Sequence, residues 1–144
     1  MAISDLQKYL DFKPYKPKKG EDYMSQAQTE HFKNILFSWK KSLMSEAEKT
    51  MDHMKQDSSK LSDPNDAATQ EEEFRLELRT RDRERKLISK IDAALRRIDD
   101  GSYGYCQETD EPINLKRLEA RPIASLSLDA QEKHERMEKI HRDE

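Results

Sequence analysis

The sequence predicts a mainly α-helical protein: a long antiparallel coiled-coil hairpin with an acidic tip, a small globular head and a C-terminal helix. Charged residues make up 40% of the chain and hydrophobic residues only 33%, which suits long helices with a narrow apolar stripe better than a compact globule. Two long segments also carry apolar residues at spacings of three and four, and the whole chain contains only 3 Gly and 5 Pro. Each arm of about 30 residues would be roughly 45 Å long.

The N-terminal region is expected to form a short helix near Ser4 to Phe12, followed by an irregular strap. The strap, Lys13 to Gly20, is basic and contains two prolines, each of which disfavours helix at the residue before it. A basic strap either contacts an acidic partner or is a solvated linker.

The first long helix is predicted to begin after Ser25 and to run to about Asp57. Ser25 with Gln28 three residues later has the pattern of a capping box. The apolar stripe, which we interpret as core, consists of Phe32, Leu36, Trp39, Leu43, Ala47, Met51 and Met54.

The second long helix is predicted to run from the turn at Asp63 to Asp100. Asp63 is placed to cap the helix, Pro64 suits its first position, and Asp66 lies in the first turn, where a carboxylate is favoured. Its apolar seam is predicted to contain Phe74, Leu78, Ile88, Ile91, Leu95 and Ile98, with Arg81 and Arg85 on the same line. The short connection makes the two helices antiparallel neighbours.

The tip of the hairpin would carry the carboxylates of Asp63 and Asp66. Capping alone would explain Asp63, but it would not explain the length of the hairpin. The alternative is a rod that reaches into a partner's cavity, where the two carboxylates engage a metal, basic groups or a mobile loop.

The head is expected to begin where Gly101 and Gly104 end the second helix. Residues 106–113 read as a small turn or knuckle, residues 115–122 as a connector, and Ser127 as the cap of a final helix to about Arg142. The candidates for burial against the hairpin base are Leu126, Leu128, Ala130 and Met137. The predicted domains are residues 1–31, an N-terminal segment on the head; 32–100, the hairpin with its tip at 58–68; and 101–144, the head and C-terminal helix.

Several classes of protein are disfavoured by composition. A single Cys allows no intrachain disulfide, the first residues do not resemble a secretory signal, and no stretch approaches the length of a membrane span. The net charge of −3 and the lack of a helix-turn-helix pattern argue against sequence-specific nucleic-acid binding. We therefore expect a cytoplasmic monomer that does not bind membranes.

Four motifs resemble the DksA/TraR family of bacterial RNA polymerase regulators. They are YMSQAQTEHFKNIL, DPNDAATQEEEFRLELRTRDRERKLISKI, YGYC and LKRLEARPIASL, and they lie between residues 23 and 128. The resemblance implies a hairpin that enters the secondary channel of RNA polymerase, with guanosine tetraphosphate as co-regulator. It implies no enzymatic activity, and thus no catalytic residue.

The resemblance also assigns roles to individual positions. Asp63, Asp66 and Ala68 match the family's functional tip, and Thr80 and Arg83 match positions that face the polymerase rim helices. Lys86, Leu87, Lys90 and Arg121 match positions of the alarmone site at the polymerase interface. Lys86 and Lys90 are one helical turn apart and suit a pyrophosphate; the alternative is a solvated face paired with Asp82 and Glu84.

The chain departs from the family's four-cysteine zinc knuckle. The four zinc positions hold Cys106, Thr109, Ser127 and Ala130, and a single thiolate does not make a structural zinc site. His31, His53, His134 and His141 do not stand at the missing positions, and a metal site from His134, Glu138 and His141 is a weaker alternative.

We therefore expect a head that folds without zinc, with apolar packing in its place. The expected apolar replacements are Pro112, Ile113, Leu126, Leu128 and Ala130. Cys106 is then either a small core residue or a redox-sensitive thiol. A second departure is Gln131, where the family often has Lys; we expect a weaker response to the alarmone.

The expected function is a transcription regulator that destabilises promoter open complexes together with guanosine tetraphosphate. Two alternatives remain: a transcript-cleavage helper of the Gre type, whose acidic tip would hold a second magnesium ion, and a plain coiled-coil adaptor.

Overall fold

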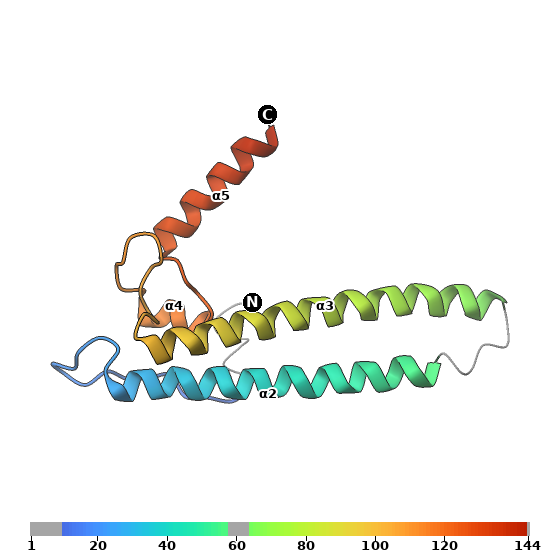
Figure 1. Cartoon of the computed structure of the whole chain (residues 1–144), viewed down its shortest axis with the longest axis horizontal. Helices are drawn as coiled ribbons and strands as arrows, with labels where there is room; N and C mark the ends of the chain where they lie inside the picture. The colour runs from blue at the N-terminus through green and yellow to red at the C-terminus, as the bar shows by residue number, and fades with distance from the viewer. Residues whose placement is uncertain (1–9, 58–63, 144) are drawn as a thin grey trace. The chain divides into compact units, whose positions relative to one another are not determined.

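The computed structural model describes residues 10–57 and 64–143 and is mainly helical (Figure 1). Its helices are α2 (Gln26–Asp57), α3 (Pro64–Asp100), α4 (Leu115–Ala120) and α5 (Leu128–Asp143). The predicted long helices are thus confirmed. The helix expected near Ser4 to Phe12 lies largely outside the described residues, with Leu10 helical and Asp11 in a turn.

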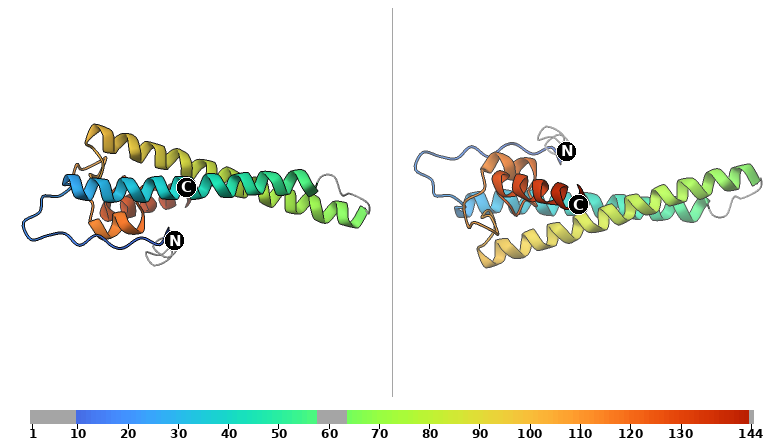
Figure 2. Two further views of the ribbon diagram at one scale, coloured as in Figure 1. Left: turned by 90° about the horizontal axis from the view of Figure 1, so that it is seen from below. Right: turned by 90° about the horizontal axis from the view of Figure 1, so that it is seen from above.

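The described residues form two compact units, and both long helices contribute to each. The first unit contains residues 10–37 and 91–143, and the second contains residues 38–57 and 64–90. Within each unit the segments of α2 and α3 lie side by side and antiparallel, as the views agree in showing (Figures 1 and 2).

The start of α2 is capped by Ser25 as predicted, but the reciprocal bond of the capping box goes to a different residue. Ser25 Oγ accepts a hydrogen bond from the Gln28 N–H at 3.3 Å, as expected. The Gln28 side chain, however, accepts from the Met24 N–H at 2.8 Å rather than from Ser25. Gln28 is 2% exposed, so this bond also satisfies a buried polar group.

The end of α3 is set by Gly101, as predicted. Gly101 has a φ of 83°, and the N–H groups of Ser102 and Tyr103 bond to the Arg97 carbonyl at 2.9 and 3.1 Å. Gly104 has a φ of 89°, and a Cβ there would lie 3.0 Å from Met24 side-chain atoms. The chain therefore turns from α3 into the head at two positions that only glycine occupies without strain.

The core of the first unit joins the base of the hairpin to the head. Phe32, Leu36 and Ile91 are fully buried, and the Phe32 ring lies 5.9 Å from that of Tyr103. The Tyr103 hydroxyl donates to the Pro122 carbonyl at 2.7 Å, which satisfies it inside the core. The other buried apolar head residues are Cys106, Ile113, Leu118, Pro122, Ile123, Ala124 and Ala130.

Three residues expected to build the head core were assigned wrongly. Leu128 and Met137 are 57% and 49% exposed, and Pro112 is also exposed. Of the predicted set, Ile113 and Ala130 are buried. Within the described residues, α5 is buried at Ala130, and the buried Tyr103, Leu118 and Ile123 contribute to the head core instead.

The seam of α3 in the second unit is less apolar than expected and includes the buried Glu84. Phe74 and Leu78 are 43% and 37% exposed, so their assignment to the seam was wrong. The inward-facing line continues from Ile91 in steps of seven to the buried Glu84 and the half-buried Glu77, which places Phe74 and Leu78 beside it. Arg81 is half-buried, whereas Arg85 is exposed and pairs with Asp82 at 3.4 Å.

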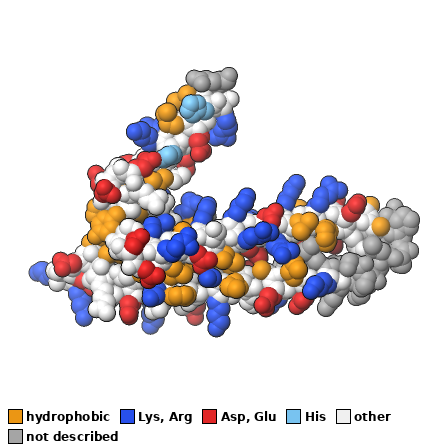
Figure 3. All heavy atoms as spheres, in the orientation of Figure 1, with side chains coloured by type: hydrophobic (Ala, Val, Ile, Leu, Met, Phe, Trp, Pro, Cys, Tyr) orange, Lys and Arg blue, Asp and Glu red, His pale blue; other side chains and the backbone are white. Residues whose placement is uncertain are grey.

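Within the described residues, no helix is long and apolar enough to cross a membrane. Lys and Arg side chains project from α3 on the face seen in Figure 3.

Candidate functional site

The predicted tip lies where α3 begins. Pro64 is the first residue of α3, as expected, so Asp66 and Ala68 fall in its opening turns and Ala68 is exposed. Asp63 lies outside the described residues, and its predicted capping role stays a prediction.

The predicted rim positions lie on the second unit. Arg83 is exposed, whereas Thr80 is half-buried and its hydroxyl donates to the Leu76 carbonyl one turn back at 3.1 Å. The Arg83 side chain is thus accessible to solvent. The Thr80 hydroxyl already has a hydrogen-bond acceptor in the Leu76 carbonyl of its own helix.

The predicted alarmone residues divide between the two units. Lys86 and Lys90 are exposed on α3 with Leu87 half-buried between them, all in the second unit. Arg121 follows α4 in the first unit; its N–H bonds to the Arg117 carbonyl at 2.8 Å and its side chain is exposed. The second unit therefore presents two cations one helical turn apart.

Glu84 is a residue whose environment was not foreseen. It is 7% exposed, and its Oε2 has no hydrogen-bond partner. Burial raises the pKa of Glu84, the nearby Glu46 raises it further, and Arg83 acts in the opposite direction. Glu84 is therefore not the solvated partner of Lys86 and Lys90 that the sequence allowed. Its position seven residues before the buried Ile91 was the available signal.

The four former zinc positions cluster at the junction of the knuckle and α5. Cys106 begins the knuckle, which closes through the Cys106 N–H bonded to the Glu111 carbonyl at 2.8 Å and an antiparallel bridge between Tyr105 and Pro112. Ser127 caps α5, its Oγ accepting from the Ala130 N–H at 3.2 Å. The cap was predicted, and it commits Ser127 to the helix.

The Cys106 sulfur is held by hydrogen bonds. Burial would raise the pKa of Cys106, but the Thr109 hydroxyl and nearby backbone N–H groups outweigh it and lower the pKa to about 6. Those N–H groups belong to Glu108, Thr109 and Ser127. Cys106 is fully buried, so it is a core residue of the knuckle.

A zinc ion does not fit this set of side chains. Zinc in structural sites takes four thiolate or imidazole ligands, whereas these positions offer one thiolate, two hydroxyls and a methyl group. Nor do three His, Cys, Asp or Glu side chains come together as a metal site anywhere in residues 10–57 and 64–143. His134, one of the weaker candidates, contacts Glu108 instead.

The N-terminal strap is fastened to the head by contacts that the sequence did not reveal. The Tyr15 N–H donates to the Glu119 carboxylate at 2.6 Å, and His31 Nε2 lies 3.4 Å from the same group. Burial lowers the pKa of His31, against the pull of Glu119. Tyr15 and Glu119 are 104 residues apart in the sequence, so no local sequence pattern predicts that they meet.

The fold and this knuckle define a class: helical-hairpin proteins whose head has the layout of a small metal-binding finger. Residues 28–98 match the family model "DnaK suppressor protein DksA, N-terminal domain", and residues 101–136 match "Prokaryotic dksA/traR C4-type zinc finger". The chain belongs to the DksA family.

Named relatives agree with this membership. The chain is 53% identical over 130 residues to the RNA polymerase-binding transcription factor DksA of Caulobacter vibrioides, covering 90% of this chain and 92% of the relative. It is 49% identical over 116 residues to the protein of the same name from Escherichia coli, covering 81% and 77%. The solved structure of transcription factor DksA2 from Pseudomonas aeruginosa matches with a TM-score of 0.77 and 38% identity, covering 92% of this chain and 98% of that one.

Proposed function

We propose that this chain is a transcription regulator that binds RNA polymerase. The observation that carries the proposal is the 53% identity, over nearly the full length of both chains, to a relative named for binding RNA polymerase. The mainly helical fold with its long α2 and α3 supports it.

The proposed mechanism follows from the family resemblance. The hairpin enters the secondary channel of the polymerase, Thr80 and Arg83 contact the rim helices, and the tip near Asp66 destabilises promoter open complexes. The protein acts as a cytoplasmic monomer, without enzymatic activity and without bound zinc. The exposed side chains of Arg83 and Ala68 are compatible with this role.

The tip is tested by transcription in vitro from a ribosomal-RNA promoter with purified bacterial RNA polymerase. The native protein should repress, and Asp66→Asn should lose about tenfold or more of that effect while its affinity for polymerase changes little, since charge at the active centre rather than docking is removed. Asp82→Asn, the same change on the exposed side of α3, should repress normally.

Other outcomes of that experiment support the alternatives. Shortening of the RNA 3′ end in backtracked complexes would identify a cleavage factor of the Gre type. Equal activity of native protein and Asp66→Asn would favour a coiled-coil adaptor.

We propose further that guanosine tetraphosphate acts through Lys86, Leu87, Lys90 and Arg121. The exposure of all three cations supports this. Gln131, where the family often has Lys, is half-buried and donates to Glu135 at 3.2 Å. The response to the nucleotide is therefore expected to be weak.

Restoring the cation should strengthen that response. Gln131→Lys should lower the nucleotide concentration needed for half-maximal repression by about fivefold, the effect of one additional exposed charge contact. Met137→Lys adds the same charge on an exposed part of α5 and should change nothing. An unchanged nucleotide response in Gln131→Lys would remove this position from the alarmone site.

A further inference from the structure

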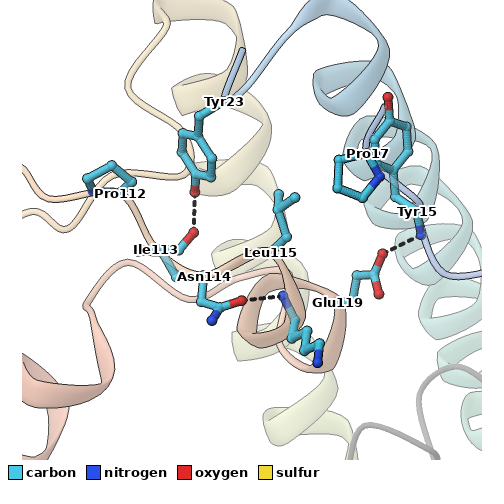
Figure 4. A pocket seen from close by; sticks show the side chains of 9 residues that line it. Tyr15, Pro17, Tyr23, Pro112, Ile113, Asn114, Leu115 and Glu119 are labelled. Carbon is cyan, nitrogen blue, oxygen red and sulfur yellow. Dashed lines mark hydrogen bonds between the residues drawn. The ribbon is translucent and has the colours of Figure 1, made fainter. Parts of the chain in front are cut away.

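A groove of about 460 Å³ lies in the first unit between the N-terminal strap and the head. Tyr15 and Pro17 line it from the strap, and Tyr23 lies across from them beside Ile113 (Figure 4). Pro112, Leu115 and Lys116 line it from the head. Its volume is in the range of pockets that hold small ligands or one or two side chains.

The walls of the groove are fixed in place. The Tyr15 N–H is bonded to Glu119, and the Tyr15 hydroxyl donates to Glu21 at 2.5 Å. The Tyr23 hydroxyl is directed at the Gly104 carbonyl, 2.7 Å away, and at the Ile113 carbonyl. Since the aromatic rings are already held, binding of an occupant would cost little side-chain conformational entropy.

The interior of the groove suits an apolar anchor. Both tyrosine hydroxyls are engaged, and the Glu119 carboxylate, 8% exposed, already accepts from Tyr15. The groups left to contact an occupant are the tyrosine rings, the two prolines and the Leu115 side chain, which enters the opening from the start of α4 (Figure 4).

The rim on the strap side is strongly basic. The strap residues Lys13, Lys16, Lys18 and Lys19 are all exposed, as is Lys116 on α4. Residues 12–20 contain no Asp or Glu, and none of these five lysines makes an ion pair in the described part of the chain. An occupant that carries negative charge over the strap would meet four unpaired lysines, and Lys116 adds a fifth from the head side of the groove.

The head side of the groove carries acidic residues as well as Lys116. Glu111 is exposed and adjoins Pro112 in the chain, and Glu119 forms part of the lining. A nucleic-acid strand, with a phosphate at every nucleotide, would place phosphates against the exposed Glu111 carboxylate. A peptide can restrict its acidic residues to the strap side, and the charge arrangement therefore favours a peptide.

We propose that this groove binds a short acidic segment of a partner protein, with an aromatic or aliphatic side chain of that segment held between Tyr15, Tyr23 and Leu115. The acidic residues of the segment lie over the strap lysines. The groove lies in the first unit and shares no residue with the tip and arm positions of the proposed function.

The test uses the full-length protein, isotopically labelled for NMR, and a short capped peptide of Asp and Glu residues around a central Leu-Phe pair. The amide signals of Tyr23, Ile113 and Leu115 should shift on titration, and the affinity should fall with added salt. Two further peptides serve as probes: one with Ala-Ala in place of Leu-Phe, and one with Lys in place of every acidic residue. Both should bind at least about tenfold more weakly.

Matched variants separate the groove from general electrostatics. Lys16→Glu with Lys116→Glu should weaken peptide binding by about tenfold, and Lys133→Glu with Lys139→Glu, two exposed lysines of α5, should leave it nearly unchanged. Both pairs change the formal charge equally, and unfolding curves would confirm that each variant folds.

The proposal is overturned by any of three results. Equal loss in both variant pairs would mean long-range charge attraction alone. Equal binding of the Ala-Ala peptide would mean that the groove holds no anchor. If an oligothymidine strand shifts the amide signals of Tyr23, Ile113 and Leu115 and binds more tightly than the acidic peptide, the surface is a nucleic-acid binding site.

Discussion

Glu84 shows how a single residue can set the character of a helical seam. Its carboxyl group lies within the second unit with one oxygen unpartnered and with Glu46 nearby. A buried carboxylate in such surroundings opposes folding whenever it is charged.

The sign of the pH effect follows from the raised pKa. The folded protein keeps the Glu84 proton at pH values where the unfolded chain has lost it. The free energy of unfolding therefore falls as the pH rises above the usual pKa of a carboxyl group. The destabilisation by the buried charge is complete above the pKa that Glu84 has in the folded protein.

Glu84→Gln should accordingly raise the free energy of unfolding at pH 7 by roughly 1 kcal/mol. The advantage should shrink as the pH is lowered through the folded-state pKa of Glu84, where the native residue becomes neutral as well. This difference in the free energy of unfolding is measured by denaturant unfolding of both proteins between about pH 4 and about pH 8. Carboxyl groups with ordinary or raised pKa values titrate in this range.

Glu73→Gln is the matched control, because Glu73 is exposed on the same helix. It should change stability by less than about 0.5 kcal/mol at every pH. A Glu84→Gln variant that is less stable than the native protein at neutral pH would show that the charge has a stabilising partner.

At the scale of the element, the knuckle keeps the layout of a zinc finger but has different chemistry. Hydrogen bonds from Thr109 and from backbone N–H groups converge on the Cys106 sulfur, and Ser127 caps α5 instead of offering a thiolate. Since Ile113 and Leu118 are buried beside it, apolar packing is available to stabilise the head.

Restoring the thiolates should restore a zinc site. The variant Thr109→Cys, Ser127→Cys, Ala130→Cys should bind one equivalent of zinc, because Cys106, Thr109 and Ser127 already meet and Ala130 lies in the same turn of α5 as the cap. Metal analysis of the purified protein, and the visible spectrum with cobalt, would measure the gain.

A strong chelator distinguishes the two proteins. The restored variant should lose several degrees of melting temperature, since bound metal contributes to folding, whereas the native protein should lose none. A native protein that purifies with one equivalent of zinc, or melts earlier after chelation, would contradict the proposal that its head folds without metal.

At the scale of the whole molecule, the two units differ in how much apolar surface they bury. Among the described residues of the second unit, the buried side chains are those of Trp39, Leu43 and Glu84. The first unit buries a continuous core that includes Phe32, Leu36 and Ile91. Local stability follows buried apolar contact, so the second unit should open more easily.

Amide hydrogen exchange should report this difference along the same helices. Amides in residues 70–90 should exchange about tenfold or more faster than those in residues 91–98, although all lie in α3. Leu43→Ala should widen the difference. Uniform protection along α3 would show that the helix opens as a single cooperative element.

Much of the architecture was determined by local sequence. Local sequence fixes the helix limits: the turns at Ser25, Ser127 and Gly101 satisfy backbone groups within a few residues. Pro64 suits the first position of α3 because it has no N–H to leave unpaired. The spacing of apolar residues likewise predicted the buried stripe of α2 at Phe32, Leu36, Trp39 and Leu43. The family membership rests on sequence motifs, which can be recognised without the structure.

The tertiary structure decided which face of each element is buried. An apolar spacing allowed Phe74 and Leu78 in the seam, but the register set by Ile91 brought Glu84 inward and left both exposed. In the same way, Leu128 and Met137 are exposed because the described part of α5 is buried at Ala130 and not along the face that carries these two residues. Burial depends on which segments meet, and contacts such as that between Tyr15 and Glu119 join residues that are distant in sequence.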